Sequence, residues 1–184
     1  MPPDPASAKK ELDPIVFELI GRATSDWSGL DYFISESIWA LALTPPPLGA
    51  CITAQIYTTD GRLRALLALL KIRQADQKLI DTVNDFANEI RGPAEKRNRI
   101  VHDIWTVHED TGAMLKVEIT AQRKLTFEVK EVDLSRLRKD VQDILDCVKR
   151  CKTIRDQIFA ALPSLPRIPL QVLHTTLQIY DPQT

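Results

Sequence analysis

Apolar residues recur at spacings of three and four along most of this chain, and that periodicity is typical of amphipathic helices. The spacing predicts a first helix that begins near Asp13, because Pro14 is tolerated only in a first turn. Thr24, Ser25 and Asp26 are residues that cap helices, so they predict a second helix. The prolines at 45–47 end that second helix.

Two further helical regions follow. The region 50–73 is apolar on nearly all sides around Leu63–Leu70, with an interruption expected at Asp60-Gly61. The region 75–104 contains Gly92-Pro93, which we expect to kink or break the helix. The segment from Pro93 onward would then be a separate short helix.

The period of the pattern changes to two after Ile104. Apolar and polar residues alternate over 115–119 and again over 125–129, which predicts a small antiparallel sheet with one solvated face. Asp133 is a good N-cap for a last long helix that ends at Pro163. The apolar run Leu170–Tyr180 in the tail is either a strand or an arm on a partner subunit.

These elements predict a mainly α protein, an up-and-down helical bundle with a β insertion at about 105–131 before the last long helix. The 184 residues suit a single domain over 1–184, with a loose N-terminal tail at about 1–7 and a C-terminal tail at about 163–184. No stretch reaches the roughly 18 apolar residues of a membrane span, and the N-terminus lacks a signal-peptide pattern. We therefore expect a cytoplasmic protein that does not contact membranes.

Three cysteines fit a reducing compartment, and Cys147 and Cys151 lie about one helical turn apart. With no second pair and no nearby histidine, they are better interpreted as small side chains on a helix face than as a zinc site. No glycine-rich phosphate loop, histidine–glutamate metal motif or nucleophile elbow occurs. We expect neither a metal nor a cofactor.

One short run carries groups able to cleave a phosphodiester: Arg97, Asn98 and His102. Arginine binds phosphate through a fixed fork of donors, and histidine transfers protons near neutral pH. On a helix, Asn98 and His102 share a face, whereas Arg97 lies about 140° around the axis and roughly 7.5 Å along it from His102. Either the long arginine curls round, or a second copy completes the site, which favours a homodimer through this helix.

The same segment is locally basic although the whole chain has a net charge of −1. Arg91, Lys96 and Arg99 accompany Arg97 against the single acid Glu95. Such a patch suits an RNA backbone, but it would also complement the dipole at a helix C-terminus.

The run resembles the signature of the HEPN superfamily, an all-helical group in which an arginine, an adjacent polar residue and a histidine lie near the end of a bundle helix. Arg97, Asn98 and His102 match that motif, and the layout over about 10–160 is similar. The resemblance implies a dimeric, metal-independent endoribonuclease in which the RNA 2′-OH attacks its own phosphate. His102 would be the general base or acid, Arg97 would stabilise charge on the phosphate, and Asn98 would orient His102 or hold a phosphate oxygen.

The resemblance further implies a toxin or defence effector whose antitoxin, if one exists, is a separate chain. Related sequences often carry a small residue at the place of Asp103. Its carboxylate is expected to pair with Arg99, to point away from the site, or to favour the protonated form of His102. Trp105 is interpreted as a packing residue at the helix-to-strand junction, with base stacking as the alternative.

Two other hypotheses stay open. The first is a non-catalytic RNA-binding or protein-interaction module, which Asp103 and the near-neutral net charge favour. The second is a structural bundle in which Asn98 simply satisfies His102 at a helix end.

Overall fold

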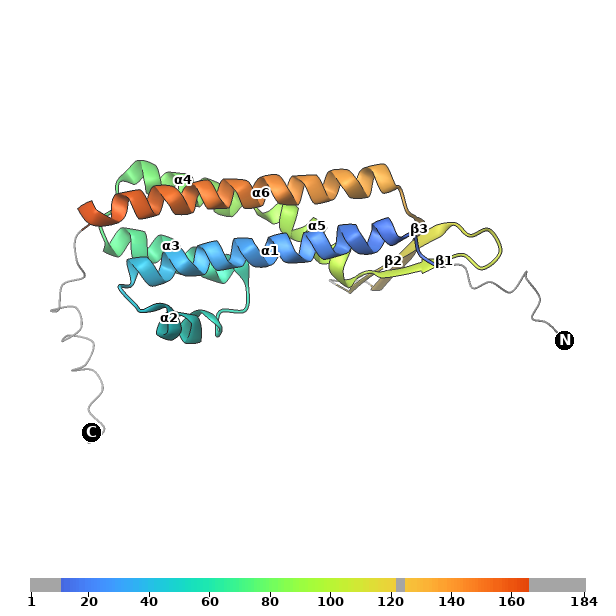
Figure 1. Cartoon of the computed structure of the whole chain (residues 1–184), viewed down its shortest axis with the longest axis horizontal. Coiled ribbons are helices and arrows are strands. Elements are labelled where there is room, and N and C mark those ends of the chain that lie inside the picture. Colours follow the sequence, from blue (N-terminus) through green and yellow to red (C-terminus); the bar gives the residue numbers. More distant parts are fainter. Residues whose placement is uncertain (1–10, 122–124, 166–184) are drawn as a thin grey trace, which may run out of the picture. The chain divides into compact units, whose positions relative to one another are not determined.

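The computed structural model describes residues 11–121 and 125–165 (Figure 1). The elements, in chain order, are α1 Pro14–Leu41, α2 Pro46–Thr53, α3 Thr59–Ile72, α4 Gln77–Glu89, α5 Arg91–His102, β1 Ile104–Val107, β2 Met114–Ala121, β3 Leu125–Glu131 and α6 Leu134–Ala161. A short 3₁₀ turn, Leu162–Ser164, follows α6. The mainly helical class and the antiparallel sheet before the last long helix are confirmed. The predicted tail at 1–7, and the residues from 166 to 184, lie outside the described residues.

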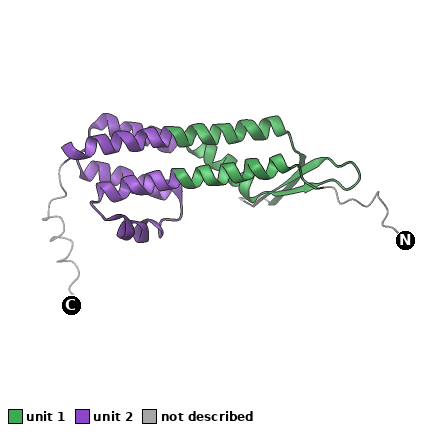
Figure 2. Ribbon diagram, viewed as in Figure 1, with its two compact units in different colours: residues 1–29, 90–149 green, residues 30–89, 150–184 purple. Residues whose placement is uncertain are grey.

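The chain divides into two compact units, coloured separately in Figure 2. One comprises residues 1–29 and 90–149 and holds α5 and the sheet; the other comprises residues 30–89 and 150–184 and holds α2, α3 and α4. Two of the three boundaries fall inside the long helices α1 and α6, and the third falls between α4 and α5. The single domain over 1–184 stays a prediction.

The break predicted at Thr24–Asp26 is wrong, because α1 runs without interruption from Pro14 to Leu41. The Thr24 and Ser28 hydroxyls donate to the carbonyls of Ile20 and Thr24, at 2.8 and 3.0 Å. Their polar groups are thus satisfied inside a continuous helix instead of capping a new one. The buried stripe continues through this point with Ala23, Trp27 and Leu30.

The other predicted breaks lie at slightly different places. The Thr58 hydroxyl accepts from Gly61 N at 3.0 Å and caps α3, so Asp60-Gly61 belongs to its first turn and the interruption precedes it. The chain breaks at Ile90 and not at Gly92-Pro93, which lies in the first turn of α5. Pro93 offers no N–H and crowds the carbonyl four residues earlier, that of Glu89, where α4 ends.

Each unit has its own apolar core. In the unit that holds the sheet, the buried side chains come from α1, Ile90, α5 and α6: Val16, Leu19, Ala23, Trp27, Ile90, Ile100, Leu137, Val141 and Ile144. In the other unit they come from α1, α3, α4 and α6: Leu30, Ile34, Ile38, Leu41, Leu63, Leu66, Leu70, Ile80, Val83, Phe86, Ile154 and Ile158, among others.

The sheet has the strand order β1-β2-β3, with both pairs antiparallel. Its register aligns Ile104 with Val117 and Val117 with Val129. The alternation predicted a single solvated face, for which the polar side would be the ordinary choice. Instead, apolar side chains such as Phe127 and Val129 are exposed at 63% and 54%. On the polar side, the exposed fraction ranges from 20% for Glu118 to 50% for Lys130.

Asp133 caps α6 as predicted: its Oδ1 accepts from Ser135 N at 2.8 Å and from Arg136 N at 3.1 Å. The Ser135 hydroxyl also donates to Asp133 Oδ1, at 2.6 Å, and this bond foremost, followed by the one from Arg136 N, lowers the pKa of Asp133. Among the described residues, no helix combines the length and the apolar character that crossing a bilayer requires.

Candidate functional site

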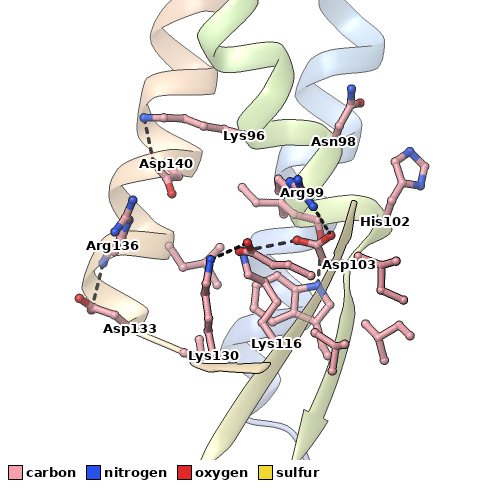
Figure 3. Close-up of a pocket in the computed structure, with 18 of the residues that line it drawn as sticks. Lys96, Asn98, Arg99, His102, Asp103, Lys116, Lys130, Asp133, Arg136 and Asp140 are labelled. Carbon is pink, nitrogen blue, oxygen red and sulfur yellow. Dashed lines mark hydrogen bonds and ion pairs between the residues drawn. The ribbon is translucent and has the colours of Figure 1, made fainter. Parts of the chain in front are cut away.

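The predicted motif lies in the C-terminal half of α5, close to the sheet. Asn98 and His102 are both exposed and lie one helical turn apart. Figure 3 shows both side chains pointing away from a network of charged residues around Asp103 and Lys116. The helix end thus presents an amide and an imidazole to solvent.

Arg97 is held by two neighbours and does not reach His102. Its Nη1 donates to Asn98 Oδ1 at 3.0 Å, and its guanidinium carbon lies 6.0 Å from the ring centroid of the buried Trp27 on α1. Its Nε is buried and makes no hydrogen bond to the described residues. The structure therefore links Arg97 to Asn98, and among the described residues no hydrogen bond joins either side chain to His102.

His102 is the last residue of α5 and its side chain is exposed. Asn98 does not satisfy it, because Asn98 Oδ1 accepts from Arg97 and no hydrogen bond among the described residues joins the two side chains. The imidazole is accessible to a substrate and is not enclosed by aliphatic groups.

Asp103 pairs with Arg99, which is one of the three arrangements expected for it. Asp103 Oδ1 lies 3.4 Å from Arg99 Nη1, and Oδ2 lies 3.5 Å from Lys116 Nζ on β2. The second distance is too long for a hydrogen bond, so Oδ2 is buried with an ion pair as its only compensation among the described residues. The Asp103 side chain is only 7% exposed, which keeps its charge away from the surface that His102 faces.

Sequence reasoning missed the charged residues of the sheet, Lys116, Glu118 and Lys130. Glu118 accepts from both lysines, at 2.7 Å from Lys116 and 2.8 Å from Lys130. These contacts, that of Lys116 foremost, lower the pKa of Glu118 to about 2. The alternation of the strands could have placed the three on one face, but only the register brings Lys130 opposite Lys116.

The predicted basic patch is largely neutralised by ion pairs. Lys96 Nζ lies 2.9 Å from Asp140 Oδ1 on α6 and also contacts Asp143. Hydrogen bonds to Asp143 and then Asp140 raise the pKa of Lys96, and the bond from Lys96 lowers that of Asp143. With Arg99 paired to Asp103, Arg91 is the exposed cation of the three, at the first residue of α5.

An open cavity of about 1310 Å³ lies beside the motif, bordered by α5, the sheet and the start of α6. Its lining includes Asn98, His102, Lys116, Glu118 and Arg136. Trp105 also lines it, and its indole N–H donates to Ile100 O at 3.0 Å, which fixes the ring at the helix-to-strand junction. The packing interpretation of Trp105 accounts for that contact.

The motif side chains are thus one accessible imidazole, one accessible amide and one guanidinium bound to that amide. This set can exchange a proton and bind an anion. Within one protomer, however, neither Arg97 nor Asn98 is hydrogen-bonded to His102 among the described residues. Among the described residues, no cluster of three or more His, Cys, Asp or Glu side chains is placed to hold a metal ion. Comparison with protein-family models, with curated proteins and with solved structures gave no match for this chain.

Proposed function

We propose that this protein is a metal-independent endoribonuclease of HEPN type that acts as a homodimer, with Arg97, Asn98 and His102 as its site. The observation that carries the proposal is the exposed His102 one turn from Asn98, with Arg97 bound to that amide. The internal pairing of Asp103 supports it, because a buried and neutralised carboxylate does not repel an incoming phosphate. A toxin or defence role, with a separate antitoxin, follows only from the resemblance.

In the reaction, the RNA 2′-OH attacks the adjacent phosphorus. The new O2′–P bond forms as the P–O5′ bond breaks, which leaves a 2′,3′-cyclic phosphate and a free 5′-OH. His102 takes the proton from the 2′-OH while water protonates the departing O5′, or His102 protonates O5′ while water takes the proton from the 2′-OH. Arg97 stabilises the charge that develops on the phosphate oxygens, and Asn98 holds Arg97 in place. The substrate supplies its own nucleophile, so the chemistry needs no metal.

The test is cleavage of labelled RNA by the purified protein in EDTA, with His102→Ala beside His108→Ala as the matched control. His108 is an exposed histidine in the turn between β1 and β2. We expect wild type and the His108 variant to yield cyclic-phosphate ends, and His102→Ala to be slower by about 10²-fold or more. Equal cleavage by wild type and His102→Ala, or none by either, contradicts the proposal.

A second candidate is a non-catalytic RNA-binding or protein-interaction module. The observation that favours it is the pairing of Lys96 and Arg99 with carboxylates, which leaves fewer cations for tight contact with a transition state. It predicts that Arg97→Ala weakens RNA or partner binding in gel shifts and pull-downs while no cleavage occurs. Blank binding assays for wild type would contradict this candidate.

A further inference from the structure

The two faces of the sheet differ in chemistry. One carries the ion pairs of Lys116, Glu118 and Lys130. The other, here named the apolar sheet face, consists of Ile104, Val117, Ile119, Leu125, Phe127 and Val129, which the register brings together across all three strands.

The apolar sheet face is uncovered by the described residues. Five of its side chains are roughly half exposed or more: Ile104 57%, Ile119 49%, Leu125 70%, Phe127 63% and Val129 54%. In an ordinary antiparallel sheet the polar face is solvated and the apolar face is covered. An exposed apolar face therefore indicates a surface that binds a partner.

The area is of the size that a dimer core requires. Taking roughly 150–200 Å² for each whole side chain, the exposed fractions sum to on the order of 500 Å². A stable interface buries about 800 Å² per partner, and its polar rim supplies the remainder. The face is too large for a scattering of single exposed apolar residues and fits the centre of such an interface.

The chemistry of the face selects the occupant. None of its six members is charged, and Glu131, which the register places beside Val129 on the same side of β3, is an acid, so the face offers no attraction to RNA or to any other polyanion. A second copy brings an identical apolar face, and a two-fold axis through it buries both faces in one step.

The face is also continuous with the motif. Ile104 lies two residues after His102, with Asp103 turned to the opposite side towards Lys116. His102 likewise points away from that ion-pair network (Figure 3). Copies joined through this face therefore bring the ends of their α5 helices near the same axis.

We propose that the apolar sheet face is the self-association surface of this protein, where a second copy docks sheet to sheet and brings the two motifs together. The role in completing the site rests on the proposed endoribonuclease function, whereas the self-association does not.

The experiment measures the mass of the full-length chain by sedimentation equilibrium over a concentration series. Phe127→Glu is compared with Phe17→Glu, a control on α1 whose exposure of 60% matches. We expect wild type and Phe17→Glu to dimerise, and Phe127→Glu to raise the dissociation constant by more than about 100-fold, because an aromatic anchor is lost and a carboxylate is buried. Circular dichroism checks folding, and Ile119→Lys, at a second position of the face, is expected to act alike.

A monomeric wild type, or a Phe127→Glu protein that still dimerises, overturns the self-association. If Leu177→Asp abolishes the dimer while Phe127→Glu still dimerises, the apolar sheet face is not the self-association surface and the C-terminal segment is. The cleavage assay separates the two proposals. A dimer that Phe127→Glu disrupts, without RNA cleavage by wild type, contradicts the endoribonuclease and leaves the self-association standing. Full cleavage by monomeric Phe127→Glu overturns the role of the face in completing the site.

Discussion

Asp103 is paired with Lys116, a residue of the neighbouring strand, and this ion pair turns the carboxylate that follows the motif histidine away from solvent. The same carboxylate holds Arg99. The cost of burying Asp103 is offset by two cations, and the motif surface is relieved of a negative charge.

Replacing Asp103 with Asn releases Arg99 while it weakens the junction between α5 and the sheet. We expect RNA to bind more tightly, with a steeper dependence on salt, because one more cation is free to contact phosphate. We also expect a loss of about 1–3 kcal/mol in the free energy of unfolding. Lys116 keeps its ion pair with Glu118 but loses the one with the buried carboxylate of Asp103. Fluorescence anisotropy across a salt series and urea titrations measure the two effects; an unchanged salt slope would count against a free Arg99.

Arg97 is expected to serve the site through its planar fork of donors as well as its charge. Arg97→Lys keeps the charge but loses the fork that binds Asn98, so single-turnover cleavage should fall by about 10-fold or more, and Arg97→Ala should fall further. Arg138→Ala, on the exposed side of α6, is the control and should cleave normally. Normal cleavage by Arg97→Lys would show that charge alone suffices.

Lys96 should stabilise the unit that holds the sheet by linking α5 to α6. Lys96→Met keeps the aliphatic stem and removes the charge, so it isolates the ion pairs with Asp140 and Asp143. The lysine side chain is 35% exposed, so solvent screening limits the expected loss to about 1 kcal/mol. Lys139→Met is the matched control: it removes a 74% exposed partner of Asp143 and should change the urea midpoint hardly at all. Equal urea midpoints for Lys96→Met and Lys139→Met would show that the ion pairs of Lys96 do not stabilise the fold.

Glu118 should make stability depend on acid pH. Its pKa in the folded protein, about 2, lies below its ordinary 4.5, so its pairing with Lys116 and Lys130 stabilises fully above about pH 4.5 and is lost as the pH falls towards 2. After allowance for solvent, we expect Glu118→Gln to lose about 1–2 kcal/mol at neutral pH and to converge with wild type at the acid end. Urea unfolding at several pH values measures this. Glu109→Gln, in an exposed turn, is the control, and parallel profiles for wild type and Glu118→Gln would contradict the assignment.

Local sequence signals predicted the element types well and the helix breaks poorly. Alternation over 115–129 located the strands, and Asp133 located the start of α6, because both signals act within a few residues. The capping residues at 24–26 predicted a helix start that does not exist, because burial of the apolar stripe of α1 outweighs the preference of Thr24 for a capping position. Pro93 breaks the helix one turn before its own position, because its ring crowds the carbonyl of Glu89, where α4 ends.

The candidate site was visible in part. The spacing of Arg97, Asn98 and His102 was sufficient to predict that the arginine and the histidine diverge in one protomer. The partner of Arg97, Trp27, lies 70 residues earlier in the chain, and the partner of Asp103, Lys116, lies on β2. Such contacts depend on packing and register, which no local pattern encodes. The exposed apolar face was missed for the same reason, because alternation shows two faces without showing which one the helices cover.

A single residue joins α5 to β1: the helix ends at His102 and the strand begins at Ile104. A joint this short has no slack, so the strand cannot tilt without turning the last helical residue with it. A displacement of β1 is therefore expected to move the end of α5 that carries the imidazole.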